Sequence, residues 1–287
     1  MPEQKELLIV GTGALATLFA ARLSAAGIRV TMLGSWQAGL DALNKHGARL
    51  IDLDGREEAH PVRAVRECET TRYALVLVKS WQTERVARQL AGYLTEDGVA
   101  LTLQNGLGNG EILADALGKE RVAQGVTTIG ANLLEAGVAR VGGEGTITLG
   151  GHPRLGPIND LLTEAGFQLA RVDDLRSLIW QKLTINAAIN PLTALLDLPN
   201  GALLENSEAR KLMGTLAREV SNVATKKSIA LGWDDPVAAV EKVARDTAKN
   251  FSSMLQDIRR GAPTEIDFIC GAVTREDFMR LWKEVEL

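Results

Sequence analysis

The sequence predicts an α/β domain over residues 1–172 followed by an all-helical domain over residues 173–287. Two observations predict this division. In the first part, short apolar runs alternate with helical patterns, which is typical of a parallel sheet covered by helices. From Asp173 onward the apolar residues recur at helical spacing. The length of 287 residues suits two domains with a sizeable core.

The composition limits which cellular compartment and which classes of partner are expected. Hydrophobic residues make up 46% of the chain and charged residues 24%, as in ordinary soluble proteins. A net charge of −4 lacks the basic footprint of a nucleic-acid-binding protein. The sequence has no apolar run long enough for a membrane span and no signal-peptide pattern at its start. Its two cysteines lie far apart, so we expect a cytoplasmic protein with no disulfide framework and no metal site.

The chain opens with the pattern of a nucleotide-binding unit. Strand, glycine turn, helix and strand follow one another at Leu7–Val10, Gly11–Ala16, a helix ending at Gly27, and Ile28–Leu33. Gly11 permits a tight turn, and Gly13 lets the backbone approach a pyrophosphate at the start of the helix. We therefore expect a Rossmann-type dinucleotide site rather than a plain turn. Its residues are Gly11, Thr12, Gly13, Ala14, Leu15 and Ala16.

The end of the second strand bears on the choice of cofactor. An NAD enzyme usually carries Asp or Glu there to hold the ribose 2′-hydroxyl. This chain has Leu33-Gly34-Ser35-Trp36 instead, which leaves room for a 2′-phosphate and favours NADP. No Arg occurs there either, so the cation for that phosphate must come from elsewhere in the chain.

Two further strands end in polar clusters. Tyr73–Val78 and Val99–Leu103 are continuous apolar runs, as expected of a parallel sheet buried on both faces. The first runs into Lys79-Ser-Trp-Gln82 and the second into Gln104-Asn105-Gly. Because ligands bind at the carboxyl ends of strands in such sheets, we expect these clusters to lie at a ligand site. A solvated lysine and a bare turn are the alternatives.

Residues 122–172 complete the predicted α/β domain. Glycines punctuate three strand patterns, at Val122–Ile129, Val138–Val141 and Thr146–Leu149. We interpret them as an antiparallel extension of the sheet. A helix over Leu155–Gly166 and a last strand over Phe167–Val172 follow.

The second domain begins with a helix that Asp173 or Asp174 can cap. Pro191 is expected to kink or end this helix. Further helices are predicted over Ser207–Gly232, from Pro236, over Ser252–Arg259 and from Thr264.

A polar row interrupts the apolar segment Trp180–Pro191. Lys182, Asn186 and Asn190 recur every four residues. On a helix of about 3.6 residues per turn they stay on nearly one face. Burying such groups is costly without partners, so the row is either a solvated stripe or the wall of a site. The cleft between two domains is a natural place for such a site.

Motifs from both domains occur together at Gly11–Ala16, Lys79–Gln82, Gln104–Gly108, Lys182–Ala194, Pro199–Gly201, Ser252–Arg259 and Thr264–Ile269. With this set the chain resembles the ketopantoate reductases (2-dehydropantoate 2-reductases), which belong to the 6-phosphogluconate-dehydrogenase-like enzymes. The resemblance runs almost from end to end. It implies reduction of 2-dehydropantoate to (R)-pantoate by NADPH in pantothenate biosynthesis.

The resemblance also implies roles for individual residues. Lys182 matches the general acid that protonates the carbonyl oxygen as hydride arrives, and a desolvated lysine would have the lowered pKa that such an acid needs. Lys79 and Gln82 match residues that hold the 2′-phosphate of NADP. Asn105 and Glu265 match residues at the nicotinamide end of the cofactor. The substrate-binding positions are Asn105, Asn186, Asn190, Asn200 and Ser253.

This chain departs from the family in three places. Ser35–Trp36 stands where the best-known members carry an Arg for the 2′-phosphate. Cys270 stands where Asn is common, and we expect it to be a small packing residue. After Thr274 the chain lacks a Gly- and Pro-containing connector, which reflects either a shortened protein or residues missing from this chain.

Two other functions stay open from the sequence. A paralogue could perform the same chemistry on another 2-oxo acid, because the preference of the pocket is not readable. A non-catalytic NADP-binding regulatory protein would be favoured by loss of the acid or of the substrate-binding residues, but all of these are present. The expected partner is thus a small-molecule 2-oxo acid, and a homodimer through the helical domain is one assembly that the family allows.

Overall fold

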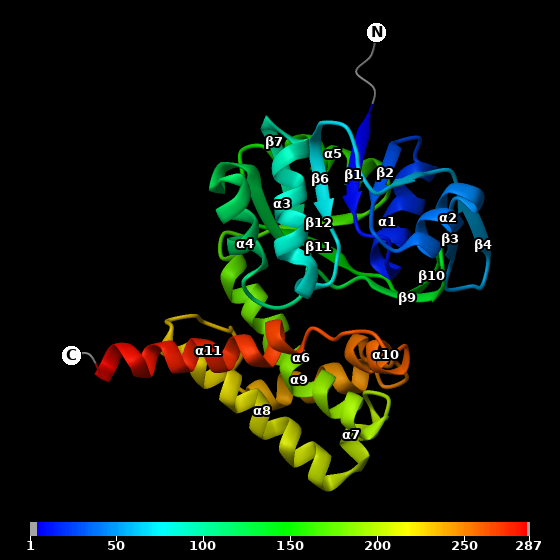
Figure 1. The fold of residues 1–287 in the computed structure, drawn as a ribbon. Coiled ribbons are helices and arrows are strands. Elements are labelled where there is room, and N and C mark those ends of the chain that lie inside the picture. Colours follow the sequence, from blue (N-terminus) through cyan, green and yellow to red (C-terminus); the bar gives the residue numbers. More distant parts are fainter. Residues whose placement is uncertain (1–4, 286–287) are drawn as a thin grey trace. The chain divides into compact units, whose positions relative to one another are not determined.

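The computed structural model describes the backbone of residues 5–285 and the side chains of residues 5–275. The chain divides into two compact units, drawn in Figure 1. The α/β unit comprises the residues up to Gln104 together with Asn109–Leu175. The helical unit comprises Asn105–Gly108 and the residues from Arg176 on. The predicted fold class, a Rossmann-type α/β part followed by a helical part, is confirmed.

The main sheet of the α/β unit has eight strands in the order β12-β11-β8-β7-β6-β1-β2-β5. In chain order these are β1 (Glu6–Val10), β2 (Arg29–Leu33), β5 (Arg63–Val65), β6 (Thr71–Val76), β7 (Leu94–Thr102), β8 (Val122–Thr127), β11 (Thr146–Leu149) and β12 (Gln168–Arg171). Strand β1 pairs in parallel with β2 on one side and with β6 on the other. The strand order therefore reverses at β1, and ligands of such sheets bind beside the carboxyl end of that strand.

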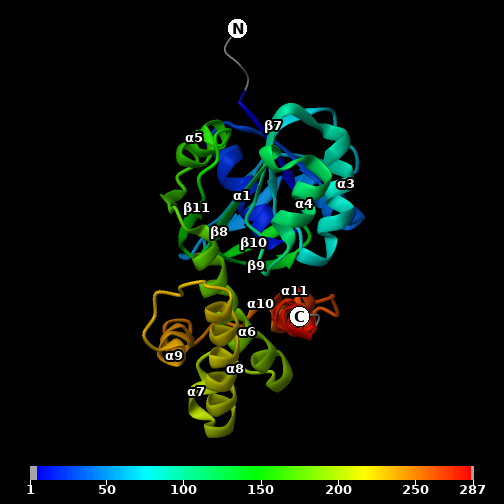
Figure 2. The same ribbon diagram turned by 90° about the vertical axis from the view of Figure 1, so that its left-hand side faces the viewer.

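Helices cover both faces of this sheet. They are α1 (Ala14–Ala25), α2 (Gln37–His46), α3 (Thr83–Tyr93), α4 (Asn109–Leu117) and α5 (Gly156–Glu164), with short 3₁₀ turns η1 (Ser80–Gln82) and η2 (Lys119–Arg121). Alternate residues of β1 point to opposite faces, as a strand requires. Leu7 and Ile9 pack in one core with α1, α2 and α5, and Leu8 and Val10 pack in the other with α3 and α4. Figure 2 shows α3 and α4 on one side of the sheet and α1 and α5 on the other.

A second, four-stranded sheet corrects the prediction for residues 122–150. Its order is β4-β3-β10-β9, with β3 (Ala48–Ile51), β4 (Glu57–His60), β9 (Gly130–Glu135) and β10 (Val138–Gly143). The predicted antiparallel extension is right for β11, which pairs antiparallel with β8. It is wrong for β10, which lies in the second sheet between β3 (parallel) and β9 (antiparallel), and for the pairing of β8 with β7, which is parallel. The second sheet was not predicted, because the polar strand β4 lacks the apolar pattern by which a strand is recognised in a sequence.

The helical unit contains α6 (Leu175–Leu196), α7 (Ala202–Glu205), α8 (Ser207–Lys226), α9 (Pro236–Asp246), α10 (Ser253–Arg259) and α11 (Ile266–Val285). Polar side chains cap three of them. Asn206 accepts hydrogen bonds from backbone amides at the start of α8, Asp235 does so for α9 and Ser252 for α10. None of the described helices is both long and apolar enough to cross a bilayer. The missing connector after Thr274 concerns residues 276–285, whose side chains lie outside the described part.

Of the two effects expected of Pro191, a kink or an end of the helix, the end does not occur. Helix α6 continues to Leu196 although proline has no N–H to donate. Ala188, Ile189 and Leu192, on both sides of the proline, are buried in one apolar cluster. This tertiary packing keeps the segment helical through the lost hydrogen bond.

Candidate functional site

The glycine turn after β1 has the geometry of a dinucleotide-binding loop. Gly11 has φ of 136°, a backbone conformation that favours glycine. Its N–H donates to the Leu33 carbonyl at 2.8 Å, which ties the turn to the end of β2. A Cβ at Gly11 would lie 3.1 Å from the Leu77 carbonyl oxygen. Glycine is therefore required here by both conformation and close packing.

The space in front of α1 suits a phosphate group. Gly13 is exposed, and a Cβ built there would meet no atom within 4 Å. The N–H groups of a first helical turn have no acceptor within their own helix, and α1 has no acidic residue in that turn. Phosphates bind at such helix ends. The residues Gly11–Ala16 thus fit the pyrophosphate of a dinucleotide.

A hydrogen-bond network fixes the position of the segment Lys79–Ser80. Gln104 Nε2 donates to the main-chain oxygen preceding Lys79 at 3.0 Å and to Thr83 Oγ1 at 2.9 Å. Thr83 Oγ1 donates to Asn109 Oδ1 at 2.7 Å, and Asn109 Nδ2 donates to Ser80 Oγ at 3.2 Å. Thr83 and Asn109 are not among the site residues predicted from the sequence, because residues so far apart in the chain show no common pattern.

The orientation of Gln82 is also determined by a neighbour. Arg85 Nη2 donates to Gln82 Oε1 at 2.7 Å, and Arg85 Nη1 donates to Gln89 Oε1 at 2.9 Å. Because an arginine can only donate, the oxygen of Gln82 faces Arg85. The amide nitrogen of Gln82 is thus left as a donor at the carboxyl end of the sheet.

In the helical unit, the polar row of α6 is not a solvated stripe. Lys182 and Asn186 are half-buried, and Asn190 is only 6% exposed. Leu183 and Ala187, between them in sequence, belong to an apolar core cluster. The burial of the row supports the interpretation of a site wall.

Burial lowers the pKa of Lys182 from 10.5 to about 8, while the charge of Glu265 acts to raise it. Glu265 is itself only 4% exposed and lies just before α11. An ammonium group with this pKa is protonated at neutral pH and gives up its proton more readily than an ordinary lysine. The surroundings of Lys182 thus lower its pKa, as expected for the candidate general acid.

The loop Asn105–Gly108 belongs to the helical unit, although it follows a strand of the α/β unit. Leu107 N donates to the Phe268 carbonyl at 2.9 Å. Gly106 has φ of 83°, and a Cβ there would lie 2.5 Å from the Phe268 oxygen. Asn105 is therefore held by the start of α11, close in sequence to Glu265. Sequence order alone could not show this attachment.

The two adjacent serines at α10 have different surroundings. Ser252 is buried, accepts from Leu255 N at 3.1 Å and is hydrogen-bonded to the Thr193 hydroxyl at 2.7 Å. Ser253 is half-buried, and its hydroxyl contacts no hydrogen-bond partner among the described residues. Ser252 is thus the structural cap, and Ser253 is the one left available to a ligand.

Asn200 presents a buried acceptor. Its Nδ2 donates to Thr247 Oγ1 at 2.9 Å, and the Thr247 hydroxyl donates its own proton to the Val243 carbonyl at 2.7 Å. Asn200 Oδ1 is buried without a hydrogen-bond partner among the described residues. Leaving such an atom unsatisfied costs free energy, which a ligand donor would recover.

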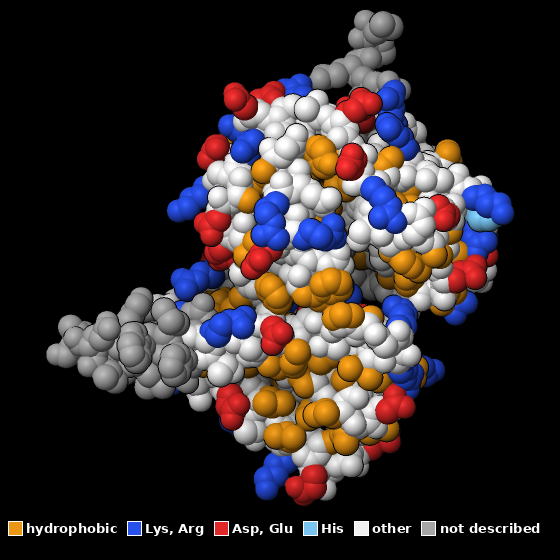
Figure 3. Space-filling model, in the orientation of Figure 1, with side chains coloured by type: hydrophobic (Ala, Val, Ile, Leu, Met, Phe, Trp, Pro, Cys, Tyr) orange, Lys and Arg blue, Asp and Glu red, His pale blue; other side chains and the backbone are white. Residues whose placement is uncertain are grey.

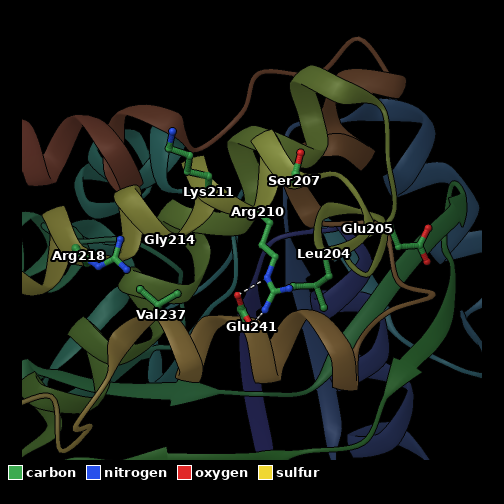
Figure 4. Close-up of a pocket in the computed structure, with 9 residues that line it drawn as sticks. All are labelled: Leu204, Glu205, Ser207, Arg210, Lys211, Gly214, Arg218, Val237 and Glu241. Carbon is green, nitrogen blue, oxygen red and sulfur yellow. Dashed lines mark hydrogen bonds and ion pairs between the residues drawn. The ribbon is translucent and has the colours of Figure 1, made fainter.

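Two other features of the helical unit take no part in this site. A hollow of about 450 Å³ between α7, α8 and α9 holds the ion pair of Arg210 with Glu241, drawn in Figure 4, but none of the predicted site residues. Cys270 packs against the core cluster that contains Leu183, and burial raises the pKa of its thiol. A packing role for this cysteine accounts for both observations.

Solved structures define the class of the protein. The chain superposes on a D-mandelate dehydrogenase bound to NADH and anilino(oxo)acetate with a TM-score of 0.89 and 25% identity, covering 96% of this chain and 92% of that one. It superposes on a ketopantoate reductase from Ralstonia eutropha with a TM-score of 0.87 and 27% identity, covering 94% and 91%. Together with the glycine turn, these likenesses define a dinucleotide-dependent oxidoreductase.

Sequence comparison gives the family. The pattern described as "Ketopantoate reductase PanE/ApbA" matches residues 7–154, and its C-terminal counterpart matches residues 174–276. The 2-dehydropantoate 2-reductase of Archaeoglobus fulgidus is 37% identical over 276 residues, 93% of this chain and 89% of the relative. That of Halobacterium salinarum is 31% identical over 275 residues, 93% and 90%. The chain belongs to the ketopantoate reductase family, as the resemblance predicted.

Proposed function

We propose that this protein catalyses the NADPH-dependent reduction of 2-dehydropantoate to (R)-pantoate in pantothenate biosynthesis. In this proposal residues 1–172 hold NADP, and residues 173–287 hold the substrate and the acid. The observation that carries it is the desolvated Lys182 on α6, with a pKa of about 8, beside the charge of Glu265. The names of the relatives from Archaeoglobus fulgidus and Halobacterium salinarum support the choice of substrate.

In this proposal the cofactor-binding residues are the glycine turn and the residues that the resemblance to the family implies. The loop Gly11–Ala16 would hold the pyrophosphate, and Lys79 and Gln82 would hold the 2′-phosphate. Asn105 and Glu265 would lie at the nicotinamide end. When bound, NADPH supplies the hydride. The open space at Gly13 and the free amide nitrogen of Gln82 support this assignment.

Lys182 acts as the general acid. A ketone oxygen gains negative charge as its carbon is reduced, and a nearby ammonium both stabilises that charge and donates a proton to the oxygen. The burial of Lys182 strengthens the electrostatic effect, because little water screens it. Glu265 opposes the desolvation and keeps the lysine charged before the reaction. Lys182 then regains its proton from solvent.

The remaining polar residues hold the substrate. Asn186 and Asn190 share the face of α6 with Lys182 and offer carboxamides to the substrate's polar groups. The free hydroxyl of Ser253 donates to the carboxylate. Asn200 Oδ1, buried and unsatisfied, accepts from a substrate hydroxyl. A 2-oxo acid that carries a hydroxyl group would use all of these groups.

A second candidate is the same chemistry on a different 2-oxo acid. The observation that favours it is the TM-score of 0.89 with a D-mandelate dehydrogenase, whose bound ligands are NADH and anilino(oxo)acetate. That neighbour combines this fold with an aromatic ligand and a cofactor without a 2′-phosphate.

A substrate panel distinguishes these functions. The purified chain is supplied with NADPH or NADH and with 2-dehydropantoate, pyruvate, a branched-chain 2-oxo acid or phenylglyoxylate, and cofactor oxidation is followed by absorbance. Highest kcat/KM on 2-dehydropantoate supports the proposal. Higher kcat/KM on another acid establishes the second candidate. Cofactor binding without turnover of any acid would revive a non-catalytic regulatory role.

We also propose a cytoplasmic homodimer that pairs through the helical unit. Hydrophobic side chains gather on the face of this unit seen in Figure 3. Large exposed apolar residues of the unit include Leu195, Leu196, Leu212, Phe251, Ile258 and Ile266. The free thiols of Cys68 and Cys270 fit a reducing compartment. Light scattering of the purified chain measures its mass, and a monomer at micromolar concentration would contradict the dimer.

A further inference from the structure

The end of β2 lacks the cation that a 2′-phosphate needs, but the neighbouring strand supplies one. Strand β5 pairs in parallel with β2, with Leu33 opposite Val65. Gly34 N donates to the Val65 carbonyl at 3.0 Å, so the pairing continues to the last residue of β5. Arg66 follows directly. It therefore leaves the sheet at the same edge as Ser35, about one strand spacing away.

The side chain of Arg66 folds toward the segment after β2. Its Nε and Nη2 both donate to Gln37 Oε1, at 3.0 and 2.6 Å. Gln37 is the first residue of α2, immediately after Trp36, and its Nε2 donates to Asp41 Oδ1 at 2.6 Å. The hydrogen bonds from Arg66 to Gln37 and from Gln37 to Asp41 thus hold the guanidinium beside the position where the family's Arg would stand.

The charge of Arg66 is not neutralised where it lies. The guanidinium contacts a neutral carboxamide, and no carboxylate lies within ion-pair distance of it among the described residues. The side chain is exposed, and a guanidinium has more N–H donors than these two contacts use. A planar, permanently charged group with free donors is well suited to a phosphate.

We propose that Arg66 holds the 2′-phosphate of NADP in place of the arginine that is absent after β2, and so sets the preference for NADP over NAD. This inference rests on the dinucleotide site of the proposed function. It adds a residue from a different strand, with Gln37 as its positioning residue. Lys79 and Gln82 follow β6, which neighbours β1, whereas Arg66 follows β5, which neighbours β2.

Direct binding tests this inference without turnover. Dissociation constants of the full chain are measured by calorimetry for NADPH and NADH, and for the fragments 2′,5′-ADP and 5′-AMP, which share the adenosine but differ in the 2′-phosphate. Arg66→Gln should weaken NADPH and 2′,5′-ADP by about tenfold or more, the scale for losing a charged hydrogen bond. It should change NADH and 5′-AMP less than about twofold. Arg66→Lys should lie between, since it keeps the charge but not the planar fork.

Arg29→Gln is the matched control, because Arg29 is an exposed arginine at the opposite end of β2. It removes the same charge and should leave all four dissociation constants unchanged. If the wild-type chain prefers NADPH and Arg66→Gln keeps that preference, the inference is wrong while the proposed cofactor stands. If the wild-type chain binds NADH as tightly as NADPH, both the inference and the proposed cofactor fail.

Discussion

Within the helical unit, the buried carboxylate of Glu265 acts electrostatically on the half-buried ammonium group of Lys182. Burial lowers the pKa of Lys182 to about 8, and the negative charge of Glu265 limits that fall. Two opposing effects therefore keep the lysine protonated at neutral pH while weakening its hold on the proton. For the proposed reduction, this balance is what a proton donor needs.

The pH dependence of turnover should report this balance. The rate of reduction requires protonated Lys182, so kcat should be highest below pH 8 and fall as the pH rises through about 8. Glu265→Gln removes the charge that raises the pKa of Lys182, so the falling limb should move to lower pH. The measurement is kcat against pH for both proteins. A limb that stays in place in the variant would separate Glu265 from the titration of Lys182.

Removing the acid should affect turnover far more than cofactor binding. Lys182→Ala should lower kcat by about 10²-fold or more, the usual scale for loss of a general acid. Lys182→Met, which keeps most of the side-chain volume, should lose as much, and neither variant should weaken NADPH binding in calorimetry. Near-normal turnover in the methionine variant would exclude Lys182 as the proton donor.

Lys79 should discriminate between the two cofactors. Lys79→Ala is expected to weaken NADPH by about tenfold or more and NADH much less, because a contact to the 2′-phosphate is charged. Fluorescence titration measures both. Lys119→Ala serves as a control, since this exposed lysine precedes β8 at the amino end of the sheet. Equal weakening of NADPH and NADH would place Lys79 elsewhere on the cofactor.

The two serines at α10 should separate binding from stability. Ser253→Ala should raise KM for the 2-oxo acid, since its hydroxyl is free to donate, and leave the melting temperature nearly unchanged. Ser252→Ala removes a helix cap and should lower the free energy of unfolding by about 1 kcal/mol. Steady-state kinetics and thermal melting give the two readouts. A raised KM in Ser252→Ala together with a lowered stability in Ser253→Ala would show that Ser252, and not Ser253, contacts the substrate.

Gly106 should be required for more than its backbone conformation. Gly106 and Gly108 both have positive φ, 83° and 89°, so alanine is strained at either position. Only at Gly106 would the added Cβ meet the Phe268 oxygen, at 2.5 Å, while at Gly108 it meets nothing within 4 Å. Gly106→Ala should therefore destabilise the chain more and also raise KM, because it displaces Asn105. If Gly106→Ala and Gly108→Ala changed the melting temperature and KM equally, both glycines would be needed only for the backbone conformation of the turn.

Local patterns carried much of the fold and the site. The turn Gly11–Ala16 and the row on α6 were recognisable because glycine conformation and helical periodicity depend on residues close in sequence. The lowered pKa of Lys182 also agrees with expectation, since an ammonium among apolar residues must be desolvated. Of the two effects expected of Pro191, an end of α6 does not occur, because the continuation of the helix depends on packing by distant residues.

By itself, the sequence determined the division into an α/β and a helical part, the dinucleotide turn and the polar face of α6. Each follows from spacing along a single element. Only the tertiary structure decided which elements share an edge or a unit. It placed Arg66 beside the end of β2, attached the loop of Asn105 to α11 and distinguished Ser253 from Ser252. These depend on strand pairing and contacts between segments far apart in the chain, which no local pattern encodes.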